Sequence, residues 1–505
     1  MRSIGGARFA SFHATRMRLR PDPTITREAL EDGKRALVKD AAWASMVGAL
    51  YGGVILVGFA LELGATPWHI GLLAAIPFLA QLAQLPAIAL IERLRERRKI
   101  AVTAVSVSRF MIAALALVAL IPDRQAALYA LLGTQVLITL FGSIGGCSLN
   151  SWLHQLLARE GLGALFSRRL FWSTVLASAG ALTTGYLVQH WPGAERLHAY
   201  ALAFLAAGLV GFLSTYYLAS VPEPVMARTG PPTPLAAMLG APFRDASFRR
   251  VIMFMASWNF ASNLAGPFVT VYLLQQLAYG MGTVTTLWIA SQIANALTMY
   301  LWGRISDRLS NKAILAVALP AYFGSLIALP FTVIPHPHAL TLPLLYLIHV
   351  VMGTAAGGIA LATGNLGLKL APQGQGTSYL AAVGLAGATA GGLAAIAGGA
   401  LADWFATREL SVFVHFTSAS AAHELVVMSF RHWEFLFALS FLCGGYVLHA
   451  LSRISEGEEH SERVVVQEFV AEASRSLAQL SPIDGLKDVL LIPLGRLRDR
   501  RLRPR

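Results

Sequence analysis

Twelve long apolar stretches follow one another along the chain, separated by short segments rich in charge, proline and glycine. Each stretch runs for about 20 residues or slightly more, the length of a helix that crosses a bilayer. Backbone groups have no water partner in lipid, so a spanning segment is helical. The predicted spans are residues 41–63, 67–91, 100–121, 126–147, 170–190, 198–220, 251–275, 284–306, 313–334, 340–363, 377–403 and 432–453. The pattern predicts an all-α polytopic membrane protein with twelve transmembrane helices.

The charges in the connecting segments predict how the helices are oriented. Cytoplasmic loops of membrane proteins are enriched in Lys and Arg. If the N-terminus is cytoplasmic, the two tails and the loops on the same side hold 35 of the 40 Lys and Arg residues. The opposite loops hold four, and Arg109 lies within the third span. We therefore expect a protein of the cell inner membrane with both termini in the cytoplasm.

Composition supports a membrane protein and removes several other classes. Hydrophobic residues make up 55% of the chain, charged residues 13%, and the mean hydropathy is +0.58. Soluble proteins carry about 25% charged residues. The net charge of +13 is concentrated in the tails, where anionic lipid headgroups explain it, so we expect no nucleic-acid partner. Cys147 and Cys443 lie in apolar segments, which predicts neither a disulfide nor a metal site.

A proline-rich segment divides the spans into two groups of six. We predict a cytoplasmic N-terminal arm (1–40), a six-helix bundle (41–220), a cytoplasmic central loop (221–250), a second six-helix bundle (251–453) and a cytoplasmic amphipathic tail (454–505). An offset of 215 residues relates the two bundles. It pairs Trp43 with Trp258, Glu92 with Asp307, Arg93 with Arg308 and Arg97 with Lys312. Transporter halves are often such repeats.

A short motif after the eighth span carries the clearest family signal. Gly303, Asp307, Arg308 and Lys312 are spaced as in G-x-x-x-D-R-x-x-x-[KR], which resembles the signature of the major facilitator superfamily. A degenerate copy follows the second span, with Ile88 in place of the glycine and Glu92 in place of the aspartate. The resemblance covers residues 39–453. It implies a secondary transporter that works by alternating access, and no enzymatic activity.

The motif residues predict a cytoplasmic gate. Gly303 would allow helices to approach closely, and Asp307 could face the positive N-terminal end of the eleventh span. Glu92 would face the start of the fifth span in the same way. The predicted gate residues are Glu92, Arg93, Gly303, Asp307, Arg308 and Lys312. The alternative is that these charges only follow the positive-inside rule, which is the favoured interpretation for Arg95, Arg97, Arg98 and Lys99.

Polar residues at helical spacing predict a central cavity. The family resemblance implies a cavity lined by spans one, four, seven and ten, with help from two, five, eight and eleven. The candidate lining residues are Trp43, Tyr51, Gln135, Thr139, Asn259, Asn263, Gln292, Asn295 and His349. The alternative is that amide and hydroxyl groups join helices in lipid. Amide and aromatic side chains favour a neutral or weakly charged organic solute.

Two ionisable residues inside spans have open roles. His349 could carry a proton, bind substrate or donate to a backbone carbonyl. Arg109 lies in a span that is peripheral in the family, so a buried arginine that is paired or bonded to helix ends is favoured over a substrate ligand. Asp and Glu occur only at span ends, so the sequence offers no embedded carboxylate relay. We expect no cofactor and no metal, and coupling to an ion gradient stays open.

Three further expectations concern the tail, the assembly and the rival functions. Residues 462–480 have an amphipathic pattern, which predicts a helix on the cytoplasmic membrane surface or, alternatively, a solvated tail. We expect a monomer whose partners are a small-molecule substrate and the bilayer. The alternative functions are a multidrug efflux exporter, which Gln135 and the proline-free segment Gly180–Gly185 argue against, and a transporter-like receptor or scaffold that moves nothing.

Overall fold

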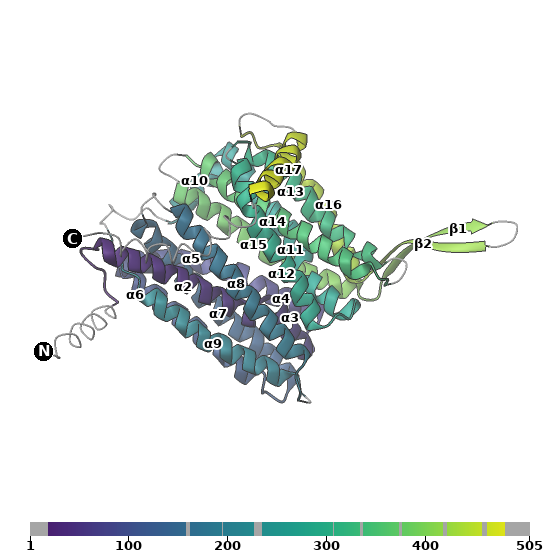
Figure 1. The fold of residues 1–505 in the computed structure, drawn as a ribbon, viewed down its shortest axis with the longest axis horizontal. Helices are drawn as coiled ribbons and strands as arrows, with labels where there is room; N and C mark the ends of the chain where they lie inside the picture. The colour runs from purple at the N-terminus through teal and green to yellow at the C-terminus, as the bar shows by residue number, and fades with distance from the viewer. Residues whose placement is uncertain are drawn as a thin grey trace.

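The computed structural model describes residues 19–157, 162–193, 195–226, 235–306, 308–333, 337–372, 376–417, 422–456 and 462–479. Long helices run side by side in one bundle, and a two-stranded hairpin projects from one end of it (Figure 1). The prediction of an all-α polytopic fold is confirmed, and the hairpin is an element that the sequence did not predict.

The first half of the chain holds the helices that precede the central loop. They are α2 (Arg27–Tyr51), α3 (Gly53–Glu62), α4 (Pro67–Ala80), the 3-10 turn η1 (Gln81–Ala83), α5 (Gln84–Leu94), α6 (Arg97–Val118), α7 (Arg124–Leu156), α8 (Leu162–Gln189) and α9 (Leu197–Ala219). Since α2 already begins at Arg27, the end of the predicted N-terminal arm is a helix continuous with the first span. Thr26 caps it by accepting a hydrogen bond from the N–H of Ala29.

The second half begins after a short helix in the central loop, α10 (Leu235–Arg244). It contains α11 (Ala246–Val271), the π-helical turn η2 (Tyr272–Gln276), α12 (Met281–Ser306), α13 (Asn311–Ala328), the 3-10 turn η3 (Pro330–Val333), α14 (Thr341–Leu370), α15 (Gly376–Phe405) and α16 (Trp433–Ser452). A final helix, α17 (Glu462–Gln479), follows the last span.

Every predicted span coincides with helical structure. In the described part of the chain, nine stretches are long and apolar enough to cross a membrane. The three predicted spans outside that set are α8, α11 and α12, which are long helices with more polar side chains. The same three helices line the cavity described below, so their polarity has a structural explanation. The count of twelve is consistent with these helices.

The two halves meet through a symmetric pair of helix contacts. Within the first half, α2 packs against α8 and α9, and α6 packs against α7 and α9. Within the second half, α11 packs against α15 and α16, and α12 packs against α14. Between the halves, α4 contacts α15 and α8 contacts α12. The second span of each half therefore meets the fifth span of the other.

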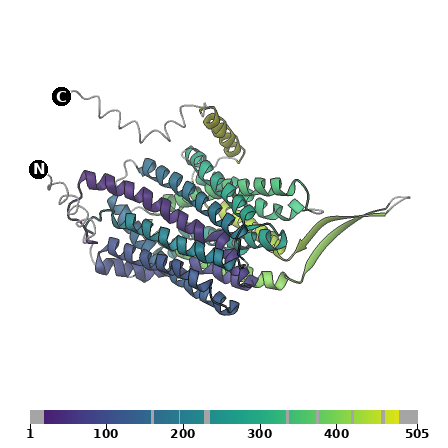
Figure 2. The same cartoon turned by 60° about the horizontal axis from the view of Figure 1, so that its bottom comes forward.

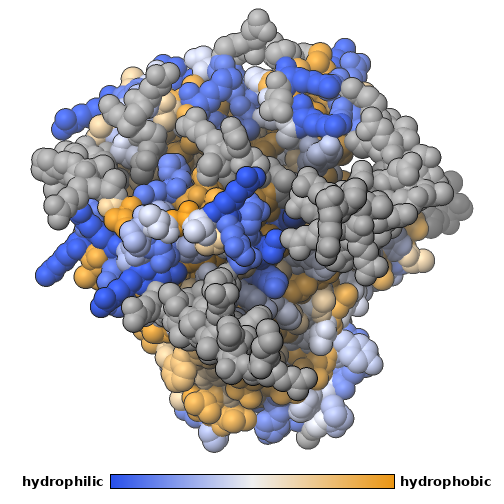
Figure 3. All heavy atoms as spheres, turned by 60° about the vertical axis from the view of Figure 1, so that its left-hand side comes forward, coloured by the Kyte–Doolittle hydropathy of each residue, from blue (hydrophilic) through white to orange (hydrophobic). Residues whose placement is uncertain are grey.

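The two ends of the bundle differ in charge. We call the end that carries the segments 92–99, 221–226 and 308–312 the motif end, and the opposite end, with the β-hairpin, the hairpin end. Hydrophilic side chains gather over the motif end, and hydrophobic ones lie on the flank below it (Figure 3). Exposed apolar side chains such as Phe110, Leu117, Leu209 and Leu442 cover the flanks. Such a surface needs lipid around it, as expected of an integral membrane protein.

The hairpin consists of β1 (Glu409–Thr417) and β2 (Ala422–Arg431), paired antiparallel between α15 and α16. Its register changes between Val412 and Phe413, which marks a β-bulge. At its base, Arg431 forms an ion pair with Glu409 at 2.7 Å. Leu410, Val412 and Val414 are exposed and alternate along β1, so they share one face.

Candidate functional site

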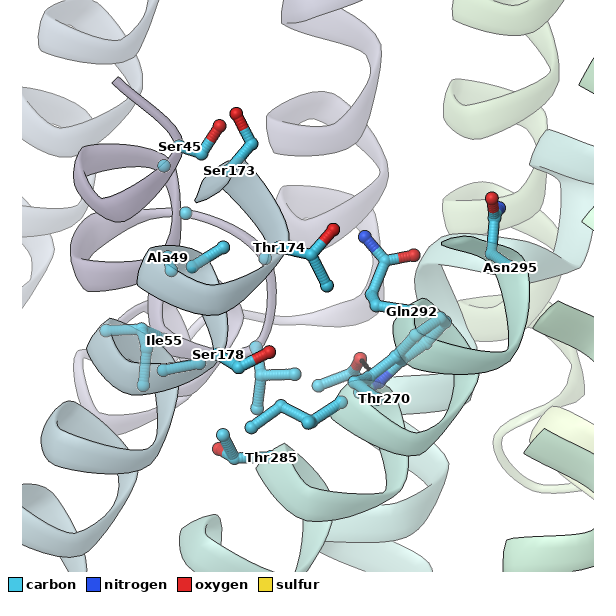
Figure 4. Close-up of a pocket in the computed structure, with 18 of the residues that line it drawn as sticks. Ser45, Ala49, Ile55, Ser173, Thr174, Ser178, Thr270, Thr285, Gln292 and Asn295 are labelled. Carbon is cyan, nitrogen blue, oxygen red and sulfur yellow. Dashed lines mark hydrogen bonds between the residues drawn. The ribbon is translucent and has the colours of Figure 1, made fainter. Parts of the chain in front are cut away.

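A cavity of about 740 Å³ lies between the two halves. We call it the central cavity, and Figure 4 shows part of its lining. Helices α2 and α3 and helix α8 form the first-half wall, and α11 and α12 form the second-half wall. Its lining residues are Ser45, Gly48, Ala49, Gly52, Gly53, Val54, Ile55, Val57, Leu170, Ser173, Thr174, Ala177, Ser178, Ala181, Gly266, Pro267, Thr270, Thr285, Trp288, Ile289, Gln292, Asn295 and Ala296.

The first-half wall combines small and hydroxyl side chains with four aliphatic ones, beside a break in the first span. The break lies between α2 and α3, where Gly52 is extended and Gly53 has φ +53. A residue with a Cβ rarely adopts this left-handed conformation, so Gly53 permits the break. On α8, Thr174 and Ser178 lie one turn apart, and Figure 4 shows Thr174 directed toward Gln292 on the opposite wall.

The second-half wall presents an aromatic ring and two amides from one face of α12. Trp288, Gln292 and Asn295 follow helical spacing and all line the cavity. The indole N–H of Trp288 donates to the hydroxyl of Thr270 on α11 at 3.1 Å. Among the residues that line the cavity, none is Asp, Glu, Lys, Arg or His. The wall can therefore hydrogen-bond a solute and cover an apolar face of it, but offers no side-chain counter-ion.

The hairpin end closes the cavity on one side. The side-chain oxygen of Gln189, at the end of α8, accepts a hydrogen bond of 2.7 Å from the N–H of Gly282. The N–H of Trp68 donates to Asp403 at 3.2 Å. In the described part of the chain, these two hydrogen bonds join the halves, and both lie at the hairpin end. Helices α4 and α15 also meet closely, since a methyl on Gly71 would lie 2.5 Å from a carbonyl oxygen of α15.

The predicted lining residues fall into two groups in the structure. Gln292 and Asn295 line the central cavity. The other seven predicted residues lie outside its lining. Asn259 and Asn263 donate to carbonyls of their own helix and lie against glycines of α15. Gln135 is buried; its main-chain carbonyl oxygen accepts from the hydroxyl of Thr139, and its side-chain oxygen has no hydrogen-bond partner among the described residues.

The remaining predicted residues lie outside the lining of the cavity. Trp43 and Tyr51 are half-buried on α2. His349 on α14 is fully buried, and its ring meets the Trp288 ring edge to face with centroids 5.6 Å apart. Its Nδ1 lies 2.8 Å from the carbonyl oxygen of Leu345, while its Nε2 has no hydrogen-bond partner. In this structure His349 supports the Trp288 wall and does not line the cavity.

Sequence reasoning missed the hydroxyls of α8. Ser173, Thr174 and Ser178 lie on one face of the fifth span at helical spacing, which is the signal that could have identified them. Arg109 was expected to be paired or bonded to helix ends. Its side chain lies across Gly211 of α9, and its Nε is buried without a hydrogen-bond partner. The buried Asp40 nearby accepts a hydrogen bond from Ser214 at 2.7 Å.

The first gate motif has two parts with different surroundings. Glu92 and Arg93 are exposed. Arg97 and Arg98, expected to serve only the positive-inside rule, are buried around the carboxylate of Glu223. That carboxylate accepts from the N–H groups of Arg97 at 2.7 Å and Arg98 at 3.1 Å. Burial raises the pKa of Glu223, and these N–H groups oppose the rise.

The second gate motif repeats this arrangement. The N–H of Lys312 donates to the carboxylate of Glu456 at 2.7 Å, as the N–H of Arg97 does to Glu223. Lys312 and Arg97 are the residues that the 215-residue offset pairs, so the internal repeat recurs in the contacts. Asp307 lies outside the described residues. A methyl on Gly303 would meet no atom within 4 Å, so the close approach expected there is not present in this structure.

Comparisons with known proteins identify the family. A family model described as Major Facilitator Superfamily matches residues 41–395. Comparison with curated proteins gives no match.

Solved structures with a similar fold are transporters. A mutant of the nucleoside transporter NupG has a TM-score of 0.60 and 14% identity, over 83% of this chain and 99% of that one. Inward-open XylE, the xylose transporter from E. coli, has a TM-score of 0.56 and 12% identity, over 87% of this chain and 98% of that one. A bacterial homologue of the iron transporter ferroportin, in an inward-facing state, has a TM-score of 0.57 and 13% identity, over 85% of this chain and 99% of that one. At such identities the likeness concerns the fold. The family match extends over most of the chain, which therefore belongs to the Major Facilitator Superfamily.

Proposed function

We propose that this protein is a secondary active transporter that moves a small, uncharged organic solute through the central cavity by alternating access. The observation that carries the proposal is the central cavity itself, which lies between two repeat-related halves and has an uncharged lining. Anionic or cationic solutes would lose their hydration there without gaining a side-chain counter-ion. A solute with hydroxyl or amide groups and one apolar face would match the two walls.

The contacts between the halves in this conformation indicate toward which end the central cavity opens. The halves are hydrogen-bonded at the hairpin end, so we infer a conformation that is closed there and opens toward the motif end. If the motif end is cytoplasmic, as the distribution of Lys and Arg predicts, this conformation faces inward. Rocking of the halves about the α4–α15 and α8–α12 contacts would then expose the cavity on the other side.

The experiment combines a binding screen with flux. Purified protein would be heated with a panel of neutral, anionic and cationic solutes, because a ligand that binds only the folded state raises its thermal stability. Solutes that stabilise it would then be tested in proteoliposomes. We expect the active solutes to be uncharged. Flux of structurally unrelated cations would favour the efflux-exporter alternative, and binding without flux would favour the receptor alternative.

A matched pair of variants on α8 tests the pathway. Thr174→Trp would fill the cavity and should abolish flux. Leu182→Trp adds a similar ring on the same helix at a side chain that is 47% exposed and outside the cavity lining, and should leave flux near the wild-type value. Wild-type flux through Thr174→Trp would show that solute does not pass through this cavity.

The gate residues remain part of the proposal. Asp307→Asn should lower flux far more than folded yield, because the carboxylate stabilises one conformation through a helix end. Glu92→Gln should have a weaker effect, because its motif lacks the glycine. Cysteine accessibility from both sides of the membrane measures the conformational shift, and unchanged accessibility and flux in Asp307→Asn would remove the gate role.

A further inference from the structure

The helix α17 packs on the motif end through a mixed apolar and charged face. Val465 is fully buried, and the Phe469 ring lies 4.5 Å from the Trp302 ring between centroids. Neighbouring residues Val466 and Val470 are exposed on another side of the helix. The sequence predicted a helix on the membrane surface or a solvated tail, and in the structure α17 is a helix that packs against α12 and α13.

The charged contacts of α17 involve the arginines of the second gate motif. Arg308 forms an ion pair with Glu468 at 2.6 Å and lies 3.9 Å from Glu472. Arg304 also pairs with Glu472, which is almost fully buried. The segment before α17 adds Glu456, which binds Lys369 at 3.3 Å. Carboxylates of the tail thus neutralise cations at the motif end of the second half.

The first half has the counterpart of Glu456 in Glu223, but among the described residues no helix there pairs with its motif end as α17 does with Arg304 and Arg308. Arg93, the repeat counterpart of Arg308, is exposed, and its side chain forms no ion pair or hydrogen bond with a described residue. Figures 1 and 2 place α17 on the outer side of the second half, away from the helices of the first half. Arg304 and Arg308 are therefore held by an element that does not belong to the opposite half.

We propose that α17 is an autoinhibitory clamp, in which Glu468 and Glu472 hold Arg304 and Arg308 and so stabilise the conformation that is open at the motif end. This inference rests on the proposed alternating access. Closing the motif end brings the gate cations toward the first half, and a cation bound to α17 has to leave its carboxylate first. Release of α17 would therefore shift the population toward the closed motif end.

The test uses the full chain, without Cys147 and Cys443, and two cysteine probes. Val465→Cys reports on docking, because it is buried while α17 is bound. Asn295→Cys reports on the opening, because it lines the cavity and can be labelled by a water-soluble thiol reagent from the motif side. In Glu468→Gln/Glu472→Gln we expect labelling of Val465→Cys to rise about tenfold. Labelling of Asn295→Cys should fall about three- to tenfold, since ion pairs whose arginines are about half exposed each shift an equilibrium by only a few-fold.

Controls separate the clamp from general effects of charge. Glu96→Gln removes an exposed ion pair with Lys99 at the motif end of the first half and should change neither probe. Arg93→Gln should leave α17 docked, whereas Arg308→Gln should release it. A chain that ends after Glu456 keeps the Glu456 contacts and removes α17, so it should reproduce the loss of Asn295→Cys labelling if the double variant folds poorly.

Failure of the clamp and failure of transport give different results. Gln189→Ala removes the hydrogen bond at the hairpin end, so it should also lower labelling of Asn295→Cys from the motif side. If α17 is released and only Gln189→Ala changes this labelling, the clamp is wrong and alternating access stands. If neither change alters the labelling, alternating access is wrong, and the clamp falls with it. Protected Val465→Cys in the double variant would show that the two glutamates do not hold α17.

Discussion

The indole N–H of Trp288 donates a hydrogen bond to the hydroxyl of Thr270 and so joins α12 to α11 at the wall of the central cavity. We expect this bond to couple the two residues by about 0.5–1 kcal/mol, the range for hydrogen bonds between membrane helices. A double-mutant cycle of Trp288→Phe and Thr270→Val, followed by thermal unfolding in detergent, measures the coupling. Additive effects of the two changes would show that the bond does not stabilise the wall.

The break in the first span predicts that two glycines of the cavity wall, Gly53 and Gly48, respond differently to replacement by alanine. Gly53→Ala should destabilise the fold by about 1–2 kcal/mol, because φ +53 is strained for a residue with a Cβ. Gly48→Ala, one turn before the break in the same wall, should be neutral or stabilise by up to about 1 kcal/mol, because a methyl there meets no atom within 4 Å. Equal unfolding temperatures of the two variants would contradict the strained conformation.

Glu223 and Glu456 make the same contact at the motif end of the two halves, but we expect their removal to lower the stability of the fold by different amounts. Glu223→Gln leaves the buried Arg97 guanidinium without its counter-charge, so we expect a loss of about 3–5 kcal/mol in unfolding free energy. Glu456→Gln should cost only about 1 kcal/mol, because the Lys369 side chain is 57% exposed and can return to water. Denaturant or thermal unfolding of both variants makes the comparison. A larger loss of unfolding free energy in Glu456→Gln than in Glu223→Gln would contradict the prediction that the buried pair contributes more stability.

The buried ring of His349 predicts a packing role. His349→Ala should lower stability by about 2–3 kcal/mol through the cavity it leaves behind Trp288. His349→Leu should stay within about 1 kcal/mol of wild type, because it fills the space and removes a buried nitrogen that has no partner. If transport is pH-dependent, that dependence should survive in His349→Leu, and its disappearance would assign a proton to this histidine.

The asymmetry of Lys and Arg predicts the topology. Reporter fusions after Val221 and after Arg453 should report the cytoplasm, and a fusion at Pro337 should report the opposite side. These three positions test both halves separately. A cytoplasmic report at Pro337 would overturn the proposed orientation of the second half.

The spans were predictable because each is a continuous apolar run, a signal that needs no knowledge of tertiary contacts. Part of the cavity was also predictable, since Gln292 and Asn295 are amides at helical spacing on a span that should face inward. The hydroxyls of α8 were missed because serine and threonine in helices often bond their own backbone, as Thr183 does with Ala179.

Other features depended on residues far apart in the chain. Arg97 looked like a topology signal because Glu223, its partner, is 126 positions away. The docking of α17 likewise depends on Arg304 and Arg308, more than 150 positions before their glutamates. The hairpin was overlooked because its apolar residues alternate with polar ones and lie outside the spans, although Leu410, Val412 and Val414 follow a strand pattern.

The β1–β2 hairpin interrupts the internal repeat at one place in the chain. Lys312 follows Arg97 by 215 positions, whereas Glu456 follows Glu223 by 233, although the four residues make the same contact in the two halves. The extra 18 positions fall between the fifth and sixth helices of the second half, where the hairpin stands, while the first half joins α8 to α9 by a short turn. The hairpin therefore accounts for the break in the 215-residue offset that otherwise relates the two halves.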